Sequence, residues 1–206
     1  MKILPLALAI ATVLPGSAMA QELYFGGGLA YSSMTSDKVL GGSGISELKT
    51  GMVSMIVGQR FAAGDSAFWA WEANADLSFG AKAENPDTGL ECALGASGSY
   101  LCGHDATLRL VGIYGAPVGQ GTEIFGSFGL AVLVGETAVD TDEVDSGMHS
   151  GMTVGLGLSH ALANGMTLRG EVIYDHFTKD NYDVPVSGNI SEVDATTFRL
   201  SLLRRF

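Results

Sequence analysis

Apolar and polar residues alternate along most of this chain with a period of two. The clearest segment covers residues 67–80. Such alternation predicts β-strands, because successive side chains of a strand point to opposite faces. One phase of the segment carries Trp69, Trp71, Ala73, Ala75, Leu77 and Phe79, and the other carries Glu72, Asn74, Asp76 and Ser78.

Eight segments of this kind can be recognised. The phase of segment 123–137 is ambiguous, because glycines interrupt both of its faces. The connections alternate between long and short, and Asn164-Gly165 in one short connection is a strong hairpin signal. The pattern predicts an all-β fold, an eight-stranded antiparallel up-and-down transmembrane β-barrel with long outer loops and periplasmic termini. The expected strands are 22–33, 50–61, 67–80, 106–115, 123–137, 147–162, 166–177 and 194–206.

The composition favours an apolar surrounding for this barrel. Hydrophobic residues make up 47% of the chain and charged residues 16%, whereas an ordinary soluble domain has roughly 25% charge. A soluble lipocalin-like barrel is the alternative, with its apolar phase inside; the low charge and an aromatic last residue favour lipid outside. The net charge of −11 argues against a nucleic-acid partner.

The N-terminus has the features of a secretory signal peptide. A basic start at Met1-Lys2 precedes an apolar stretch, and Ala18-Met19-Ala20 supplies a small-x-small cleavage pattern. An N-terminal membrane anchor is the alternative, but the apolar run is too short to span a bilayer. We therefore expect cleavage between Ala20 and Gln21, with residues 1–20 as the signal peptide and residues 21–206 as the barrel domain.

The C-terminal strand carries its apolar residues on alternate positions and ends on an aromatic ring: Phe198, Leu200, Leu202 and Phe206. This pattern resembles the C-terminal signature of bacterial outer-membrane proteins. In that family the terminal Phe and its strand are read by the β-barrel assembly machinery, so the resemblance implies that machinery as a partner. Arg204 departs from the pattern, since the family usually has an apolar or aromatic residue there.

Together these features resemble the small outer-membrane barrel families, including opacity-type porin-like proteins and the transmembrane domain of outer-membrane protein A. The resemblance implies an outer-membrane location in a Gram-negative envelope, contact with lipid and lipopolysaccharide, and a structural or adhesin-like role carried by the loops. The alternatives are a small porin for solutes and, less favoured, a lipid A-modifying enzyme. We expect a monomer without a cofactor, and the sequence identifies no surface ligand.

The inward phase of the predicted strands carries several charges. In an eight-stranded barrel the lumen is just wide enough for side chains to fill it. Strand positions place Asp76 level with Arg109, and Glu171 level with Arg199. A structural ion-pair network is the favoured interpretation, with a polar pore or an acid–base pair as the alternative. The predicted lumen charges are Glu72, Asp76, Arg109, Arg169, Glu171, Asp175 and Arg199.

Cys92 and Cys102 are the two cysteines. An exported protein meets an oxidising compartment, so we expect them to form a disulfide in the second outer loop. No zinc-ligand spacing accompanies them. The acidic segment 138–146 could bind calcium, but it lacks the spacing of an EF-hand, and a solvated loop is the favoured interpretation; we expect no metal site.

The histidines raise the question of catalysis. Ser159 and His160 are neighbours on a predicted strand, so they should point to opposite faces and cannot pair directly. His149, His160 and His176 supply no match to the His-x-Ser segment of the lipid A deacylase family, and the sequence contains no G-x-S-x-G elbow. We therefore expect no enzyme activity and assign no catalytic residue.

Overall fold

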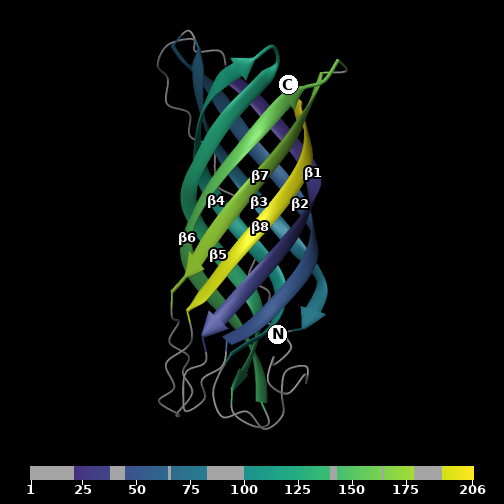
Figure 1. The fold of residues 1–206 in the computed structure, drawn as a ribbon, viewed down its shortest axis with the longest axis vertical. Coiled ribbons are helices and arrows are strands. Elements are labelled where there is room, and N and C mark those ends of the chain that lie inside the picture. Colours follow the sequence, from purple (N-terminus) through teal and green to yellow (C-terminus); the bar gives the residue numbers. More distant parts are fainter. Residues whose placement is uncertain are drawn as a thin grey trace.

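The computed structural model describes residues 21–37, 45–64, 66–82, 100–139, 143–163, 165–178 and 192–206. They form one closed barrel in which each strand pairs antiparallel with its sequence neighbours and the last strand pairs with the first (Figure 1). This confirms the predicted fold. The strands are β1 (Gln21–Asp37), β2 (Ile45–Ala63), β3 (Ala67–Lys82), β4 (Tyr100–Gly119), β5 (Thr122–Val139), β6 (Glu143–Ala161), β7 (Met166–Phe177) and β8 (Val193–Arg205).

All eight predicted strands are present, but most are longer than predicted. Only β7 has the predicted bounds, whereas β4 begins at Tyr100 instead of residue 106. A second error concerns segment 138–146, which was predicted to be a loop. There β5 continues to Val139, β6 begins at Glu143, and these two residues are paired. An antiparallel ladder can continue past the apolar part of a hairpin, because its hydrogen bonds come from the backbone and do not depend on side-chain polarity.

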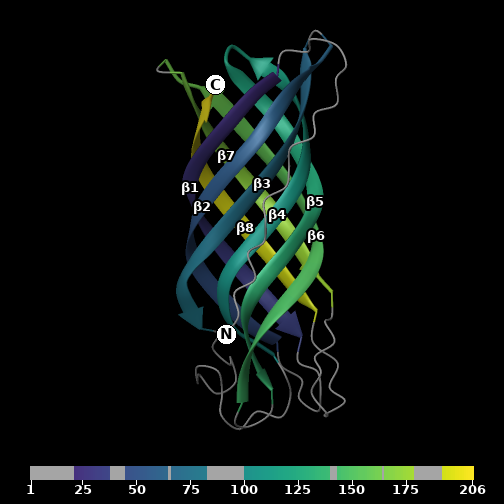
Figure 2. The same ribbon diagram turned by 180° about the vertical axis from the view of Figure 1, so that it is seen from behind.

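The two ends of the barrel differ. One end, here called the turn end, carries the short connections between β2 and β3, β4 and β5, and β6 and β7. Gly64, Gly121 and Gly165 lie in these turns with φ of 72°, 70° and 78°, a conformation that favours glycine. Phe206 lies at the same end, where the chain terminus is marked at the top of Figures 1 and 2. The opposite end is called the loop end.

The exterior of the barrel is apolar and the interior is polar at its centre. Leu29, Leu130 and Phe198 point outward and are 66%, 65% and 58% exposed, whereas Glu72 and Asp76 are fully buried inside. The predicted phases are therefore correct. The ambiguous strand β5 points Ile124 and Leu130 outward and Phe125 and Leu133 inward. The described part of the chain contains no helix long and apolar enough to cross a membrane.

Aromatic side chains pair on the exterior of the turn end. Phe25 stacks on Phe206 with ring centroids 5.0 Å apart, and Phe61 stacks on Trp69 at 4.1 Å. The backbone N–H of Phe206 donates to the Leu23 carbonyl at 2.9 Å, which extends the ladder between β1 and β8 to the end of the chain. Such rings are typical of the aromatic girdle of a transmembrane barrel.

Candidate functional site

The lumen is the candidate functional site, and its side chains lie in layers along the barrel axis. Strand β8 passes through all of them. From the loop end, its inward residues are first apolar, then polar around Arg199, then apolar at Leu203 and finally charged at Arg205. This order defines a loop-end apolar layer, a central ionic network, a turn-end apolar layer and a charged rim.

The loop-end apolar layer closes the lumen with tightly buried side chains from β1, β2, β5, β7 and β8. Leu133, Phe177 and Val193 have no exposed surface. Packing of this kind excludes water, because apolar interiors have few voids larger than one water molecule. The layer consists of Met34, Leu48, Ala131, Leu133, Phe177, Val193 and Ala195.

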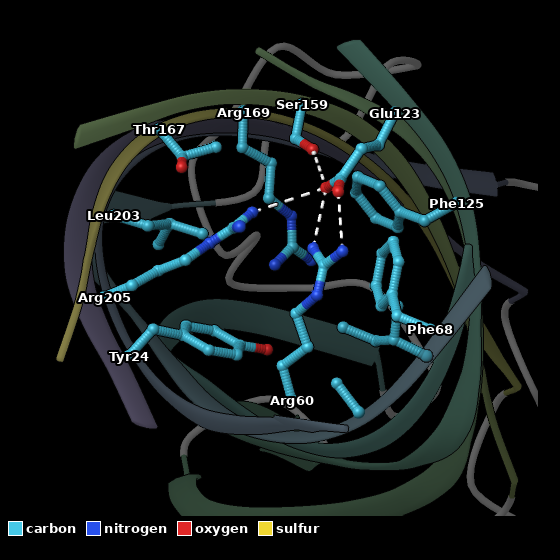
Figure 3. A pocket seen from close by; sticks show the side chains of 12 residues that line it. Tyr24, Arg60, Phe68, Glu123, Phe125, Ser159, Thr167, Arg169, Leu203 and Arg205 are labelled. Atoms are coloured by element: carbon cyan, nitrogen blue, oxygen red, sulfur yellow. Dashed lines mark hydrogen bonds and ion pairs between the residues drawn. The ribbon is translucent and has the colours of Figure 1, made fainter. Parts of the chain in front are cut away.

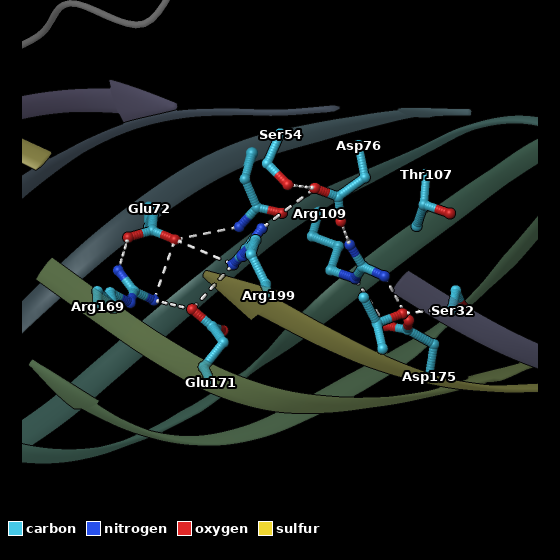
Figure 4. A network of polar contacts seen from close by, with 12 residues as sticks. Ser32, Ser54, Glu72, Asp76, Thr107, Arg109, Arg169, Glu171, Asp175 and Arg199 are labelled. Carbon is cyan, nitrogen blue, oxygen red and sulfur yellow. Dashed lines mark hydrogen bonds and ion pairs between the residues drawn. The ribbon is translucent and has the colours of Figure 1, made fainter. Parts of the chain in front are cut away.

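The part of the central ionic network nearer the loop end is organised around Arg109 on β4. Its guanidinium bridges two aspartates that come from β3 and β7 (Figure 4). Arg109 Nε and Nη2 donate to Asp175 at 2.9 and 2.6 Å, and Nη1 donates to Asp76. The Ser54 hydroxyl on β2 donates to the other oxygen of Asp76. Both aspartates are fully buried. The pair with Asp76 joins the neighbouring strands β3 and β4, whereas the pair with Asp175 joins β4 to β7, which is not its neighbour in the sheet.

The part nearer the turn end is organised around Arg169 on β7. Arg169 donates through both Nη atoms to Glu72 on β3, and its Nη2 lies 2.6 Å from Glu171 Oε2. The Tyr24 hydroxyl and the Asn74 amide also donate to Glu72, at 2.9 and 3.2 Å. Hydrogen bonds to a buried carboxylate replace those it would make with water.

Arg199 on β8 joins the two parts. Its Nη2 lies 3.1 Å from Glu171 and 3.7 Å from Glu72, and its Nη1 lies 3.5 Å from Asp76. The residue is 4% exposed. Because Arg199 contacts three carboxylates, the whole network is one connected set of buried charges.

The turn-end apolar layer contains three aromatic rings, and each lies across from a glycine on the next strand. The pairs are Tyr24 with Gly58, Phe68 with Gly115, and Phe125 with Gly157. A Cβ at position 58 would fall 2.5 Å from the Tyr24 ring. The glycines thus make room for the rings. The layer consists of Tyr24, Ile56, Phe68, Ala70, Val111, Ile113, Phe125 and Leu203.

The charged rim closes the turn end. Arg60 donates to both oxygens of Glu123 at 2.8 and 2.6 Å, and Arg205 lies 3.4 Å from the same carboxylate (Figure 3). Ser159 also donates to Glu123, at 3.0 Å. Between this rim and Arg169 is a cavity of about 40 Å³, which is room for about three waters, since one needs about 10–15 Å³.

The structure places all seven charges predicted for the lumen inside it and joins them in one network. Asp76 contacts Arg109, and Glu171 contacts Arg199. Glu171 is level with Arg199 as expected, whereas Arg109 is level with Asn74, two positions from Asp76. The sequence reasoning missed Tyr24 and the rim residues Arg60 and Glu123. All three occupy the inward phase of their strands, so a count of alternating positions through the turns would have found them.

The structure shows where the histidines lie, but it does not test the predicted disulfide. Ser159 points into the lumen, and His160 points outward and is 2.9 Å from the Thr122 hydroxyl, so the two lie on opposite faces as predicted. His176 lies on the exterior, 2.8 Å from Asp194. The predicted disulfide involves Cys92, which lies outside the described residues, as do residues 140–142 of the acidic segment. In the described ranges, no group of three or more potential ligands could hold a metal ion.

Comparison with known proteins adds the family. A family model described as the outer membrane protein beta-barrel domain matches residues 6–206. The chain belongs to this family. It is therefore an outer-membrane β-barrel protein, and its exterior apolar band is the surface that faces lipid. No curated protein matches the sequence.

Solved structures of small outer-membrane barrels resemble this one. OprG of Pseudomonas aeruginosa is 14% identical, with a TM-score of 0.56 over 91% of this chain and 97% of OprG. Ail, the attachment invasion locus protein of Yersinia pestis, is 13% identical, with a TM-score of 0.54 over 91% of this chain and 100% of Ail. At these identities the likeness concerns the fold.

Proposed function

We propose that this protein is a structural and surface-interaction barrel of the outer membrane, with its specificity in the segments beyond the loop end. The observation that carries the proposal is the filled lumen. Two apolar layers and an ionic network lie in series across it, and a packed eight-stranded barrel leaves no path for solutes. A solute channel, the alternative function, would need these layers to move apart.

In this proposal the loop end faces the outside of the cell and the turn end faces the periplasm. Short turns on the periplasmic side and longer outer connections are the rule for bacterial barrels. The stacked pair of Phe25 and Phe206 then lies at the inner interface, where aromatic rings favour the headgroup level. Lipid and lipopolysaccharide surround the barrel, and the assembly machinery acts on Phe206.

The likeness to Ail suggests attachment as the kind of interaction. One Ail structure is a complex with a heparin analogue, sucrose octasulfate. A highly sulfated ligand does not suit this chain, because its net charge is −11 and segment 138–146 contains four carboxylates and no basic residue. We therefore expect a cationic or uncharged ligand.

A complemented deletion strain tests the proposal. One strain produces the full chain, and another produces a barrel in which residues 83–99 and 179–191 are replaced by short Gly-Asn turns. We expect both forms to restore resistance to detergent, while only the full chain restores adhesion to cultured epithelial cells. Equal adhesion by both strains would contradict the surface role, and lost uptake of small solutes in the deletion strain would favour the channel.

A further inference from the structure

The hairpin of β5 and β6 extends beyond its neighbours at the loop end, as Figures 1 and 2 show. β6 begins at Glu143, but it pairs with β7 only from Gly151 onward. The last contact on that side comes from Thr178, whose backbone N–H and hydroxyl both donate to the Ser150 carbonyl, at 3.0 and 3.1 Å. Among the described residues, 143–148 therefore have a strand partner on the β5 side only.

We propose that this open edge of β6, residues 143–148, is a docking site for an extended, basic peptide segment of a partner protein, which joins the sheet as a further strand. The backbone N–H and C=O groups along a sheet edge are a template for such pairing. Main-chain hydrogen bonds supply the affinity in this mode of recognition. The inference rests on the proposed surface role and adds to it a contact of defined chemistry.

The direction of the backbone groups along the open edge is fixed at two points of β6. The Ala161 N–H donates to the Gly121 carbonyl on the β5 side, whereas the Ser150 carbonyl accepts from Thr178 on the β7 side. Backbone groups of successive residues point alternately to the two sides of a strand, and the pairing of β6 with β5 contains no register shift. Even-numbered residues therefore present their N–H and C=O groups to the open edge. On this edge they are Val144, Ser146 and Met148.

Two further strands lie behind the open edge and order it. β6 pairs with β5 from Glu143 onward, opposite Val139. β5 in turn pairs with β4 as far as Ala138, opposite Tyr100. The projecting part is thus a three-stranded sheet that continues into the barrel. An edge that is already ordered lowers the entropic cost of binding, because mainly the incoming segment has to be fixed.

The charges of the open edge favour a basic partner. Residues 143–148 include Glu143 and Asp145 and no basic residue. Opposite charges on paired strands stabilise a sheet, whereas like charges opposite one another destabilise it. A second copy of this chain docked edge to edge would bring the same carboxylates together, and the net charge of −11 adds repulsion. A segment with lysine or arginine at alternate positions is therefore the occupant that the edge favours.

β2 also extends past its neighbour, but it is a poorer docking site. It begins at Ile45, and its pairing with β3 begins at Met52. β3 nevertheless lies beside this part of β2, as the distance of 2.6 Å between the Thr50 and Ser78 hydroxyls shows. β2 also carries Lys49 here, and lysine commonly protects an exposed edge, as do proline and bulges. Residues 143–148 contain neither lysine nor proline and pair with β5 without a bulge.

Binding of a synthetic peptide to the detergent-purified barrel, measured by fluorescence anisotropy, tests the proposal. The probe alternates valine and lysine and is as long as the open edge, and its counterpart alternates valine and glutamate. Ser146→Pro removes an edge-facing N–H without removing a ladder bond to β5, which a strand edge tolerates, whereas Ser146→Ala keeps the backbone donors. We expect the wild type and Ser146→Ala to bind the lysine peptide alike and to reject the glutamate peptide. Ser146→Pro should bind the lysine peptide about tenfold more weakly.

Two readouts separate strand addition from simple charge attraction, and they need only the wild type if Ser146→Pro does not fold. A lysine peptide methylated at every backbone nitrogen keeps its charges but cannot donate to β6, so it should not bind. Hydrogen exchange at the amides of Val144, Ser146 and Met148 should be rapid in the protein alone and slow with the unmethylated peptide.

Several results would overturn the docking site. They are equal binding by the wild type and a folded Ser146→Pro, equal binding of the methylated and unmethylated peptides, and slow exchange of the three amides without peptide. Slow exchange at every protein concentration would mean that the chain's own residues cover the edge, and slow exchange only at high concentration would mean that a second copy does. Equal adhesion of the two strains described above rejects the surface role instead, so the two failures are distinguishable.

Discussion

The Tyr24 ring on β1 lies over Gly58 on β2, and the two residues are directly paired across the strands. The ring extends over the glycine, and its hydroxyl donates to Glu72 on β3, the strand beyond β2, at 2.9 Å. This one contact connects the turn-end apolar layer to the central ionic network. Because Gly58 has no side chain, the Tyr24 ring on the neighbouring strand has room to reach the Glu72 carboxylate.

Gly58→Ala should destabilise the barrel. The new Cβ would lie 2.5 Å from the Tyr24 ring and 2.7 Å from the Trp71 carbonyl oxygen, and displacing the ring breaks its bond to Glu72. Overpacking of this kind costs about 1–3 kcal/mol in the free energy of unfolding, measured by urea titration in detergent. Gly112→Ala is the matched control, because its Cβ would have no atom nearer than 3.8 Å. Equal losses for both variants would contradict this role of Gly58.

The apolar exterior predicts that the cost of an outward-facing charge in the free energy of unfolding depends strongly on its position along the strand. Leu200 points outward in the middle of β8 and is 58% exposed, so Leu200→Arg should cost about 2–4 kcal/mol if it lies near the bilayer midplane. Thr35 also points outward but lies near the loop end of β1, where Thr35→Arg should cost about 0–1 kcal/mol. Refolding titrations in lipid vesicles measure both, and equal tolerance would reject the assignment of the lipid-facing band.

Deletion of Phe206 should impair assembly more than stability. The deletion removes one stacked pair, worth about 0.5–1.5 kcal/mol, and one backbone hydrogen bond of similar size. Phe25→Ala removes the same stacking and leaves the terminus intact. Heat-modifiable migration on gels should show much less folded barrel in the outer membrane for the deletion than for Phe25→Ala. Similar levels of the two variants would mean that Phe206 acts through packing.

The disulfide between Cys92 and Cys102 remains a prediction from export and spacing. Mass spectrometry of protein from native envelopes should find both thiols protected from alkylation without reductant. Cys102 lies within β4, so the cross-link would join this strand to the preceding connection. Two free thiols would refute the prediction.

Alternation of apolar and polar residues predicted the fold because a strand with lipid on one side and a polar lumen on the other has two different environments. It succeeded for β3, where Trp69 belongs to the outward-facing positions and Glu72 to the inward-facing ones. It left β5 unresolved, because Gly126 and Gly129 have no side chains and do not show which face of the strand is apolar. The strand ends near the loop end were underestimated, since Val139 and Glu143 pair through the backbone whatever their side chains are.

The same reasoning predicted which charges meet but not how the lumen is layered. Glu171 and Arg199 are directly paired on adjacent strands, and Arg109 pairs with Asn74, two positions from Asp76, so a comparison of adjacent strands finds both contacts. The bridge from Arg109 to Asp175 crosses the lumen, and it depends on strand tilt and side-chain reach, which a one-dimensional pattern does not contain. The pairing of Phe125 with Gly157 similarly follows from the register, which the turns set.

The central claim of this account is that the lumen is sealed, and single-channel recording in planar bilayers tests it most directly. The recordings compare the wild type with a variant in which Leu133, Arg199 and Leu203, one residue from each internal layer, are all replaced by glycine. The account predicts no discrete conductance steps for the wild type and measurable steps for the opened variant. Steady wild-type conductance equal to that of the opened variant would contradict it.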